Sequence, residues 1–321
     1  MFLTVTPNPC IERTVVIEDF TIGEVHRVPS ANLQINAGGK GINAARVAAR
    51  LGCSVLATAW TGSTQHEWFR AQLAREGVAH DLVETPSDTR VCINILDGSG
   101  GKTEIVEAGS PLHSEDAARM TKKFASLLPR ADLVAICGSY PPGGDDDFDS
   151  HLASLVQLAR RDGKRVIVDG KGKSFEILMR GGQAPWCIKP NLDEARQLLR
   201  QSIDNAAEEF AAVGTLLKLG VEVVILSCGA RGAYLGTTRD IWFLQAPPIR
   251  EISPVGSGDS LVGAFAAKFL ETNDLVEAAR WGVAAGAANA GQVRAGFCER
   301  ADIEMLLPQV QVQVQVTLYR A

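Results

Sequence analysis

The residues with the clearest capacity for chemistry lie in segment 254–260, which reads Pro-Val-Gly-Ser-Gly-Asp-Ser. An apolar run rich in Gly and Ala follows, so we expect a helix that begins near Ser257. Free N–H groups in the first turn of a helix bind anions. Asp259 would repel a phosphate there, unless it takes a proton from a hydroxyl that attacks the phosphate. The segment therefore indicates phosphoryl transfer, and Asp259 as a simple charge at the helix N-terminus is an equal alternative.

The elements that must position this segment alternate along the chain. Short, nearly continuous apolar runs rich in Val and Ile predict buried strands at 2–6, 54–61, 133–137, 165–169, 186–189 and 221–227. Helical patterns lie between them at 42–51, 148–161 and 192–200. This alternation predicts a parallel sheet covered by helices on both faces. In such sheets ligands bind beyond the carboxyl ends of the strands, where several polar or Gly-rich segments follow the predicted strands.

Three of these segments have chemistry of their own. Segment 227–232 (Ser-Cys-Gly-Ala-Arg-Gly) offers closely spaced backbone N–H groups to a phosphate chain, or forms a plain turn. Asn191 and Glu194 share one face of a first helical turn and could face a metal-bound phosphate. They also match a capping box, with Asn191 as N-cap. Segment 37–43 combines three glycines with Lys40, which suits an anionic ligand, or is a Gly-rich turn with a solvated lysine.

Two regions interrupt the alternation of strands and helices. Residues 12–36 and 90–107 show paired amphipathic β segments with turn signals, including the turn at 97–101. We expect them to form a small separate sheet over one edge of the main domain. Arg90 begins the second of these regions and is either a phosphate ligand or a solvated charge. The strictly alternating tail at 309–316 predicts an edge strand with one buried face, or a disordered tail.

Composition narrows the class of protein. The chain has 321 residues, 46% of them hydrophobic and 21% charged, with a net charge of −5. These values predict a globular protein with no nucleic-acid partner and no membrane association. Seven scattered cysteines without a C-x-x-C pair predict reduced core thiols and a cytoplasmic location. The five histidines show no ligand spacing, and no G-x-S-x-G or H-E-x-x-H motif occurs.

Several of these segments match the signatures of one known family in order. The chain resembles the PfkB (ribokinase-like) carbohydrate kinases over essentially its whole length, and within them the phosphosugar kinases such as 1-phosphofructokinase and tagatose-6-phosphate kinase. The matching segments are 4–9, 38–46, 89–90, 138–139, 189–194, 227–233 and 254–260. The resemblance implies an α/β fold, a three-layer αβα sandwich with a mostly parallel central sheet and a small β-sheet lid, in a single kinase domain spanning 1–321.

The resemblance also implies roles for individual residues. Asp259 would be the catalytic base, and the backbone of Gly256, Ser257 and Gly258 would form an anion hole for the transferred phosphoryl group. ATP and Mg²⁺ would be the cofactors, with Glu194 holding the metal through water. The implied ATP-binding residues are Lys189, Asn191, Ser227, Gly229, Gly232 and Asn289. The implied substrate-binding residues are Glu12, Arg27, Gly38, Gly39, Lys40, Asn43, Arg90 and Ser139.

The implied reaction is the ATP-dependent phosphorylation of a ketohexose phosphate to a bisphosphate. Fructose 1-phosphate, tagatose 6-phosphate and fructose 6-phosphate are the candidate acceptors. Lys40 and Arg90, with Arg27 in the lid, would bind the phosphate that the acceptor already carries. The family usually has Asp where Glu12 stands, and this departure bears on the choice of sugar.

Alternative hypotheses belong to other classes. A non-catalytic sugar-phosphate sensor on the same fold would lack turnover, and a kinase of an unphosphorylated sugar would not need the cationic residues. A nicotinamide oxidoreductase would need a G-x-G-x-x-G turn after the first strand, and the sequence has none there. Because lid sheets in this superfamily often pair two subunits, we also expect a homodimer through the lid.

Overall fold

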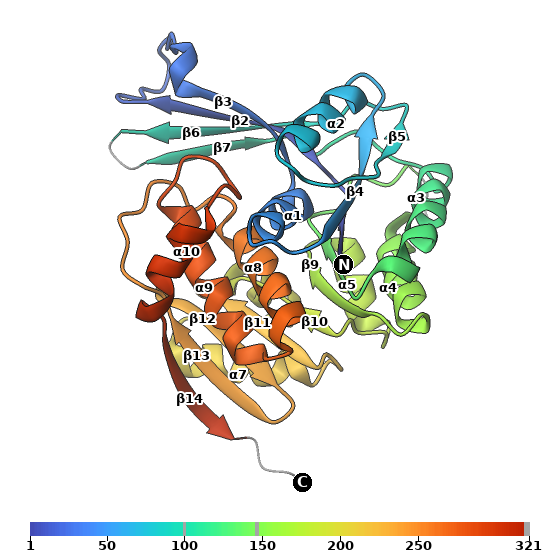
Figure 1. Cartoon of the computed structure of the whole chain (residues 1–321), viewed down its shortest axis with the longest axis vertical. Helices are drawn as coiled ribbons and strands as arrows, with labels where there is room; N and C mark the ends of the chain where they lie inside the picture. Colours follow the sequence, from blue (N-terminus) through green and yellow to red (C-terminus); the bar gives the residue numbers. More distant parts are fainter. Residues whose placement is uncertain (99–100, 145–147, 318–321) are drawn as a thin grey trace.

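The computed structural model describes residues 1–98, 101–144 and 148–317. Within them the largest element is a ten-stranded sheet of order β14-β13-β12-β11-β10-β9-β8-β1-β4-β5 (Figure 1). In this order, the seven strands from β11 to β5 pair in parallel with their neighbours. Strands β12, β13 and β14 add an antiparallel edge. The strands are β1 (Phe2–Thr6), β4 (Val55–Gly62), β5 (Val83–Thr85), β8 (Leu133–Cys137), β9 (Arg165–Asp169), β10 (Cys187–Ile188), β11 (Val223–Ser227), β12 (Gly232–Thr237), β13 (Asp240–Gln245) and β14 (Gln311–Thr317).

Helices cover both faces of this sheet. One face packs against α1 (Lys40–Arg50), α2 (His66–Arg75), α8 (Ser257–Thr272), α9 (Leu275–Ala290) and α10 (Arg300–Leu306). The other face packs against α3 (Ser114–Leu127), α4 (His151–Arg161), α5 (Lys173–Arg180), α6 (Leu192–Leu199) and α7 (Ala206–Leu217). In β8, Ala135 and Cys137 pack in the first core, and Val134 and Ile136 pack in the second. Helices on both faces of the sheet confirm the predicted αβα sandwich. Both faces are covered because the strands carry apolar side chains on both sides.

Short 3₁₀ helices occur between or beside these elements. They are η1 (Ser30–Asn32), η2 (Leu128–Arg130), η3 (Phe148–Ser150), η4 (Gly229–Arg231) and η5 (Leu307–Gln309). Of these, η4 matters most for the site, because it shapes the loop between β11 and β12.

A second, four-stranded sheet stands beside the large one (Figure 1). Its strands are β2 (Cys10–Ile17), β3 (Leu33–Gly38), β6 (Val91–Asp97) and β7 (Lys102–Val106), in the order β3-β2-β6-β7. The β segments predicted at 12–36 and 90–107 form this sheet, which we call the lid sheet. Ser99 and Gly100 of the predicted turn lie outside the described residues.

The large sheet departs from the sequence prediction at its antiparallel edge. Strands β12 and β13 were not predicted, because Gly, Thr, Arg and Asp interrupt their apolar pattern. The predicted edge strand in the tail is confirmed as β14, which pairs with β13. Its predicted buried face is limited to Val310, which is 5% exposed, whereas Val312 and Val314 are 36% and 64% exposed. Alternation identifies a strand, but burial also needs a layer packed against it, and β14 lies at the open edge.

The cysteines are free thiols, and six of the seven are buried, as predicted. Cys53 is the half-buried exception. Among residues 1–98, 101–144 and 148–317, no helix has both the length and the apolar character needed to span a membrane.

Candidate active site

A cavity of about 770 Å³ is bounded by loops at the carboxyl ends of the large-sheet strands and by one face of the lid sheet. Its wall brings together most of the predicted site residues, which are Glu12, Gly39, Lys40, Asn43, Arg90, Lys189, Asn191, Ser227, Gly229, Gly232, Gly256, Ser257, Gly258 and Asp259. From the lid sheet it also contains Asn94, Lys102 and Glu104, which the sequence did not single out. Segments more than 200 residues apart in the chain thus share one wall.

Helix α8 begins at Ser257, as predicted. Gly256 is the N-cap residue with φ +80°, a left-handed conformation that favours glycine. A Cβ at this position would lie 2.6 Å from the Cβ of Ala295. The N–H of Ser257 donates to the carbonyl of Pro254 at 3.1 Å, so it closes the turn. This contact differs from the predicted anion hole, in which Ser257 N–H was expected to face the ligand.

Asp259 lies in the first turn of α8 and is 7% exposed. The side chain of Asn43 donates from Nδ2 to its Oδ2 at 2.9 Å. Burial raises the pKa of Asp259 to about 6, an effect that the nearby ammonium of Lys40 opposes. A carboxylate with a pKa just below neutrality is ionised at pH 7 and still accepts a proton readily. The environment therefore suits a general base.

Two lysines meet at Asp169 in the floor of the site. Asp169, at the end of β9, is fully buried. Its Oδ1 lies 3.0 Å from Nζ of Lys40, and its Oδ2 lies 3.5 Å from Nζ of Lys189. Burial alone would raise the pKa of Asp169, but the two ammonium groups outweigh it and lower that pKa. Asp169 was not predicted as a site residue, although its place at a strand end was the available signal.

The lysines also lie near the turn before α8. A Cβ at Gly258 would lie 3.1 Å from Nζ of Lys189, so the ammonium closely approaches the first turn of α8. Nζ of Lys40 is 3.4 Å from Oε1 of Glu194. Burial would lower the pKa of Lys40, but Asp169, Glu194 and Asp259 outweigh it and raise that pKa. Lys40 is therefore a cation beside the place where an anion would meet the helix N-terminus, and Nζ of Lys189 lies at the same turn.

On the other side of the cavity, α6 begins with a capping box. The N–H of Glu194 donates to Oδ1 of Asn191 at 2.8 Å, and the N–H of Asn191 donates to Oε2 of Glu194 at 3.0 Å. The capping alternative for this pair is thus present in the structure. It leaves Oε1 of Glu194 directed toward Lys40.

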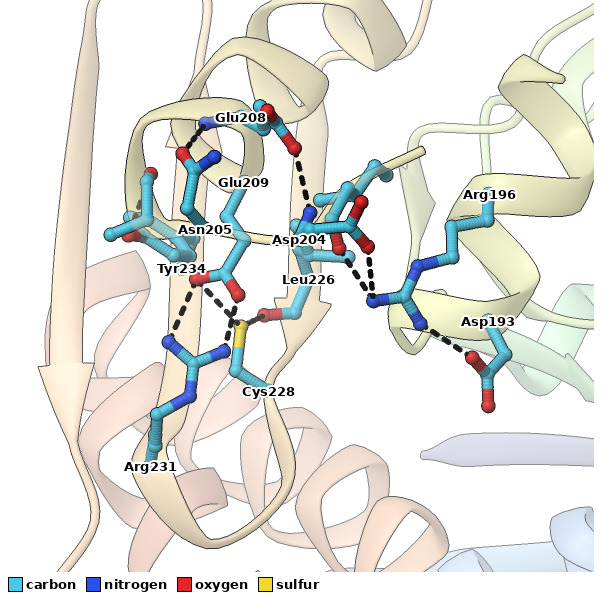
Figure 2. Close-up of polar contacts among 12 residues, drawn as sticks. Asp193, Arg196, Asp204, Asn205, Glu208, Glu209, Leu226, Cys228, Arg231 and Tyr234 are labelled. Atoms are coloured by element: carbon cyan, nitrogen blue, oxygen red, sulfur yellow. Dashed lines mark hydrogen bonds and ion pairs between the residues drawn. The ribbon is translucent and has the colours of Figure 1, made fainter. Parts of the chain in front are cut away.

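The loop from Ser227 to Gly232 is held from behind by one ion pair. Figure 2 shows Arg231 directed at Glu209 of α7, away from the neighbouring Asp193–Arg196–Asp204 group. Nη1 of Arg231 donates to Oε2 of Glu209 at 3.0 Å, and Sγ of Cys228 lies 3.9 Å from the same oxygen (Figure 2). The arginine of this segment therefore fixes the loop, while Ser227, Gly229 and Gly232 line the cavity.

The lid side contains a buried acid. Glu12 is 5% exposed, and its Oε1 accepts from Nδ2 of Asn94 at 3.0 Å. Burial raises the pKa of Glu12 to about 7. Arg90 lies beside it, but its nitrogens donate to the carbonyls of Asn8 and Glu107 at 2.9 Å each and more weakly to Pro9. Arg90 thus ties the β1–β2 loop to the end of β7 while part of it faces the cavity.

Five predicted residues lie outside the cavity wall, which does not include Arg27, Gly38, Ser139, Glu194 or Asn289. Arg27 is exposed in the segment between β2 and β3. Gly38 backs onto Glu12, and Ser139 Oγ accepts from Asn8 at 3.4 Å.

Asn289 has a different environment from the predicted nucleoside contact. It is fully buried, and its Nδ2 donates to the carbonyl of Val255 at 2.7 Å and to Oγ of Ser257 at 3.2 Å. Its Oδ1 accepts from Oγ of Ser260 and from the N–H of Gly296. The amide holds the turn before α8 from behind, and its neighbours Ala287 and Ala290 face the cavity instead.

The described residues contain no cluster of three or more His, Cys, Asp or Glu that could hold a metal ion. Mg²⁺ in nucleotide enzymes usually has one or two carboxylates, several waters and the substrate phosphates as ligands. Glu194 supplies one such carboxylate, whose Oε1 lies 3.4 Å from Nζ of Lys40. Both oxygens of Asp169 already face ammonium groups, at 3.0 Å from Lys40 and 3.5 Å from Lys189. This donor set fits a metal held mainly by phosphates and water.

A scan against family models gives one match that spans this whole arrangement. The pfkB family carbohydrate kinase model matches residues 8–302, which includes the lid sheet, both lysines and the Asp259 turn. The chain belongs to this family of carbohydrate kinases.

Solved structures agree with the family. Phosphofructokinase-2 from Escherichia coli, solved in complex with potassium, is 27% identical with a TM-score of 0.87, covering 96% of this chain and 98% of that one. The same enzyme in complex with fructose-6-phosphate is 26% identical with a TM-score of 0.84, at the same coverage. A possible 1-phosphofructokinase from Thermotoga maritima, at 24% identity, has a TM-score of 0.89, with 98% and 99% covered. This pfkB kinase therefore has the fold of phosphofructokinase-like sugar phosphate kinases.

Proposed function

We propose that this pfkB kinase transfers the γ-phosphoryl group of ATP to a hydroxyl of a ketohexose phosphate and forms a bisphosphate. The observation that supports this most strongly is the position of Asp259. It is a buried carboxylate at the N-terminus of α8 and faces a cavity that the lid sheet shares. Such an acid next to an anion site suits removal of a proton from an attacking hydroxyl.

In this proposal Asp259 accepts the proton of the acceptor hydroxyl as the hydroxyl oxygen attacks the γ-phosphorus. Asn43 holds Oδ2 of Asp259 by a hydrogen bond, which leaves Oδ1 for the acceptor. The N–H groups of Gly256 and Gly258 and the ammonium of Lys189 stabilise the equatorial oxygens of the transferred group. Their positive charge lies where negative charge develops in the transition state. Such electrostatic stabilisation is the largest contribution to rate enhancement in many phosphoryl-transfer enzymes.

The nucleotide would lie along the loops that follow β10 and β11. Lys189, Asn191, Ser227, Gly229 and Gly232 are on that side of the cavity. The adenine and ribose would contact the apolar part of the wall, which contains 246–249, Val283, Gly286, Ala287 and Ala290. Glu194 would hold Mg²⁺ through water, and the bound metal would neutralise charge on the phosphates.

The acceptor would lie between Asp259 and the lid sheet. Glu12 and Asn94 suit sugar hydroxyls, because the carboxyl and amide groups of this pair accept and donate hydrogen bonds. Lys40, Arg90 and Lys102 are the cations of this half of the wall, and they support a phosphate on the acceptor. Arg90 contributes its charge and any guanidinium hydrogens that the backbone carbonyls do not use.

A coupled assay of ADP release tests the function. Fructose 1-phosphate, fructose 6-phosphate, tagatose 6-phosphate and unphosphorylated fructose are compared at equal concentration with ATP and Mg²⁺. We expect turnover with one phosphosugar at least tenfold above that with fructose. Equal or greater turnover with fructose would contradict a phosphorylated acceptor. Binding of a phosphosugar without any ADP release would instead support a sugar-phosphate sensor.

We also propose that two copies pair through the outer face of the lid sheet. Leu33, Ile35 and Ile105 are 37%, 41% and 52% exposed there, which is unusual for an isolated sheet. One of the Escherichia coli phosphofructokinase-2 structures is of a tetrameric inhibited form. Sedimentation of the wild type and of Ile35→Asp tests the pairing, since the charged variant should shift toward the monomer.

A further inference from the structure

Arg46 is a fully buried arginine in α1, directly behind the proposed base. Its Nη1 donates to Oδ1 of Asn43 at 2.8 Å, one helical turn earlier. Nδ2 of Asn43 in turn donates to Oδ2 of Asp259 at 2.9 Å. A continuous chain of hydrogen bonds therefore leads from a buried guanidinium to the carboxylate.

The direction of the Asn43 amide decides what Asp259 experiences. A side-chain amide has an oxygen that accepts and a nitrogen that donates, and a rotation by 180° exchanges them. Because a guanidinium only donates, Arg46 requires the oxygen of Asn43 on its side. The nitrogen must then point at Asp259, where it favours the ionised carboxylate.

The rest of the guanidinium is held in place from three sides. Nε donates to Oε2 of Glu76 at 2.8 Å, and the Glu76 side chain is only 9% exposed. Nη2 donates to the carbonyl of Ala37 at 2.7 Å, at the end of the lid strand β3. The ring of Phe297 lies 4.3 Å from the guanidinium carbon. Arg46 cannot turn away without breaking these contacts, so the amide direction is fixed by the fold.

We propose that Arg46 is a positioning residue for the kinase reaction: it sets the direction of the Asn43 amide and so keeps Asp259 a hydrogen-bond acceptor and a competent base. The inference rests on the proposed role of Asp259. Without Arg46, the amide is free to present its oxygen to the carboxylate, which would repel the ionised form.

Other charged groups also act on the carboxylate of Asp259, and none of them is changed in an Arg46 variant. Lys40 of α1 and Lys189 after β10 favour the ionised carboxylate, whereas Asp169 of β9 opposes it. Asp259 in turn raises the pKa of Glu12 of β2, as a neighbouring acid does. Arg46 also directly lowers the pKa of Glu12. The part of the change in the pH profile that disappears in the Asn43→Ala background is therefore the part that reports the Asn43 hydrogen bond.

The test compares Arg46→Met with Arg50→Met. Arg50 lies one turn later on α1 and also contacts Phe297, at 4.6 Å, but pairs with Glu299 at 3.2 Å. We expect R46M to lower kcat by roughly 10–100-fold with KM for the acceptor changed less than threefold, as for a misplaced catalytic group. Its acid limb of kcat/KM should move up by about one pH unit, the size expected for one lost hydrogen bond to a charge. R50M should leave both unchanged.

Because the acceptor phosphate also titrates near pH 6, only differences between variants on one substrate are interpreted. Arg46→Lys retains a buried cation and a donor for Asn43, so it should recover at least part of the lost kcat. If R46M is too unstable to purify, Asn43→Ala, which removes the same hydrogen bond to Asp259, is compared with R50M instead. A kcat and a pH profile equal to those of R50M, for R46M or for Asn43→Ala, would overturn the proposal.

A double-mutant cycle separates positioning from a general structural role. In the Asn43→Ala background, R46M or R46K should change kcat by less than about twofold, because the connection to Asp259 is already lost. The same fold-loss in both backgrounds would overturn the proposal, since Arg46 would then act independently of Asn43. Failure of the kinase function itself is distinguishable, because the wild type would then show no turnover with any phosphosugar.

Discussion

Two walls of the cavity are each supported by one arginine–glutamate pair. The two pairs differ in the exposure of the arginine, while the glutamate is buried in both. On the side of the base, Arg46 is 0% exposed and its partner Glu76 is 9% exposed. On the nucleotide side, Glu209 is 3% exposed and Arg231 is 51% exposed. In the first pair the cation is enclosed by protein, and in the second pair about half of the cation's side chain is exposed to solvent. Figure 2 shows the contacts of the second pair.

This difference changes what each pair does. Burial lowers the pKa of Arg46, Glu76 opposes this effect, and the position of Arg46 is transmitted through Asn43 to Asp259. The hydrogen bond to Glu209 raises the pKa of Arg231, whose charge is also stabilised by water. We infer that substitutions in the Arg46–Glu76 pair lower stability and activity more than substitutions in the Arg231–Glu209 pair.

The largest expected effect is that of Asp259→Asn. Loss of a general base typically costs roughly 10²–10⁴-fold in kcat, and ATP affinity should stay within about threefold. Steady-state kinetics and titration with an ATP analogue measure the two quantities. The matched change on the nucleotide side, Ser227→Ala, should alter KM for ATP by less than about tenfold, as for one neutral hydrogen bond. Near-normal turnover of D259N would remove Asp259 from the mechanism.

The second-largest expected effect is a loss of stability when the glutamate of either pair is replaced by glutamine. Glu76→Gln leaves Arg46 buried without its counter-charge and should destabilise the protein by about 3 kcal/mol. Glu209→Gln leaves Arg231 free to turn to water and should cost about 1 kcal/mol. Denaturant unfolding of both variants at pH 7 measures the difference. Equal losses would contradict the contrast in burial between the two regions.

A third prediction concerns pH and stability on the base side. The folded-state pKa of Asp259, about 6, lies above its ordinary value, so burying the ionised carboxylate costs free energy at pH values above 6. D259N removes this cost and should be more stable than wild type by about 3 kcal/mol at pH 8. The difference should shrink as pH falls through 6 and disappear near pH 4, where the wild-type carboxyl is protonated. A difference independent of pH would show that the pKa is not raised.

The smallest expected effect is at an exposed pair far from both walls. Arg70 and Glu67 of α2 are 54% and 81% exposed and are three residues apart. Glu67→Gln should change the free energy of unfolding by less than about 0.5 kcal/mol and leave kcat unchanged. It serves as the reference against which the losses at Glu76 and Glu209 are judged.

Most of the parallel sheet and the Asp259 turn could be predicted from sequence, because their signals are local. Apolar runs of strand length identify β1, β8, β9 and β11, and Gly-Ser-Gly-Asp before an apolar run identifies the start of α8. The edge strands β12 and β13 were missed, because their pattern is interrupted and their stability comes from pairing with β11 and β14. The open edge also left Val312 and Val314 exposed.

The contacts of individual side chains were harder to predict than the strands and helices, because they depend on partner residues from distant segments. Asn289 was expected at the nucleoside, yet its amide bonds the start of α8 and the loop after α9, through Val255, Ser257, Ser260 and Gly296. Arg90 was expected as a phosphate ligand, and three of its donors contact backbone carbonyls. Asp169 and Arg46 received no role, because their roles depend on distant partners. Lys40 lies 129 residues from Asp169, and Asp259, which Arg46 reaches through Asn43, lies 216 residues from Asn43.

The sequence by itself determined which residue types stand at strand ends and helix starts, since turn chemistry, capping and apolar periodicity act over a few residues. The capping box of Asn191 and Glu194 is such a case. The tertiary structure alone decided the meeting of Lys40 and Lys189 at Asp169, the burial of Arg46 and the direction of the Asn43 amide. These features depend on the low dielectric of the protein interior and on partner residues that meet only when the sheet, α1 and α8 pack together. The order of residues along the chain shows neither the burial nor the partners.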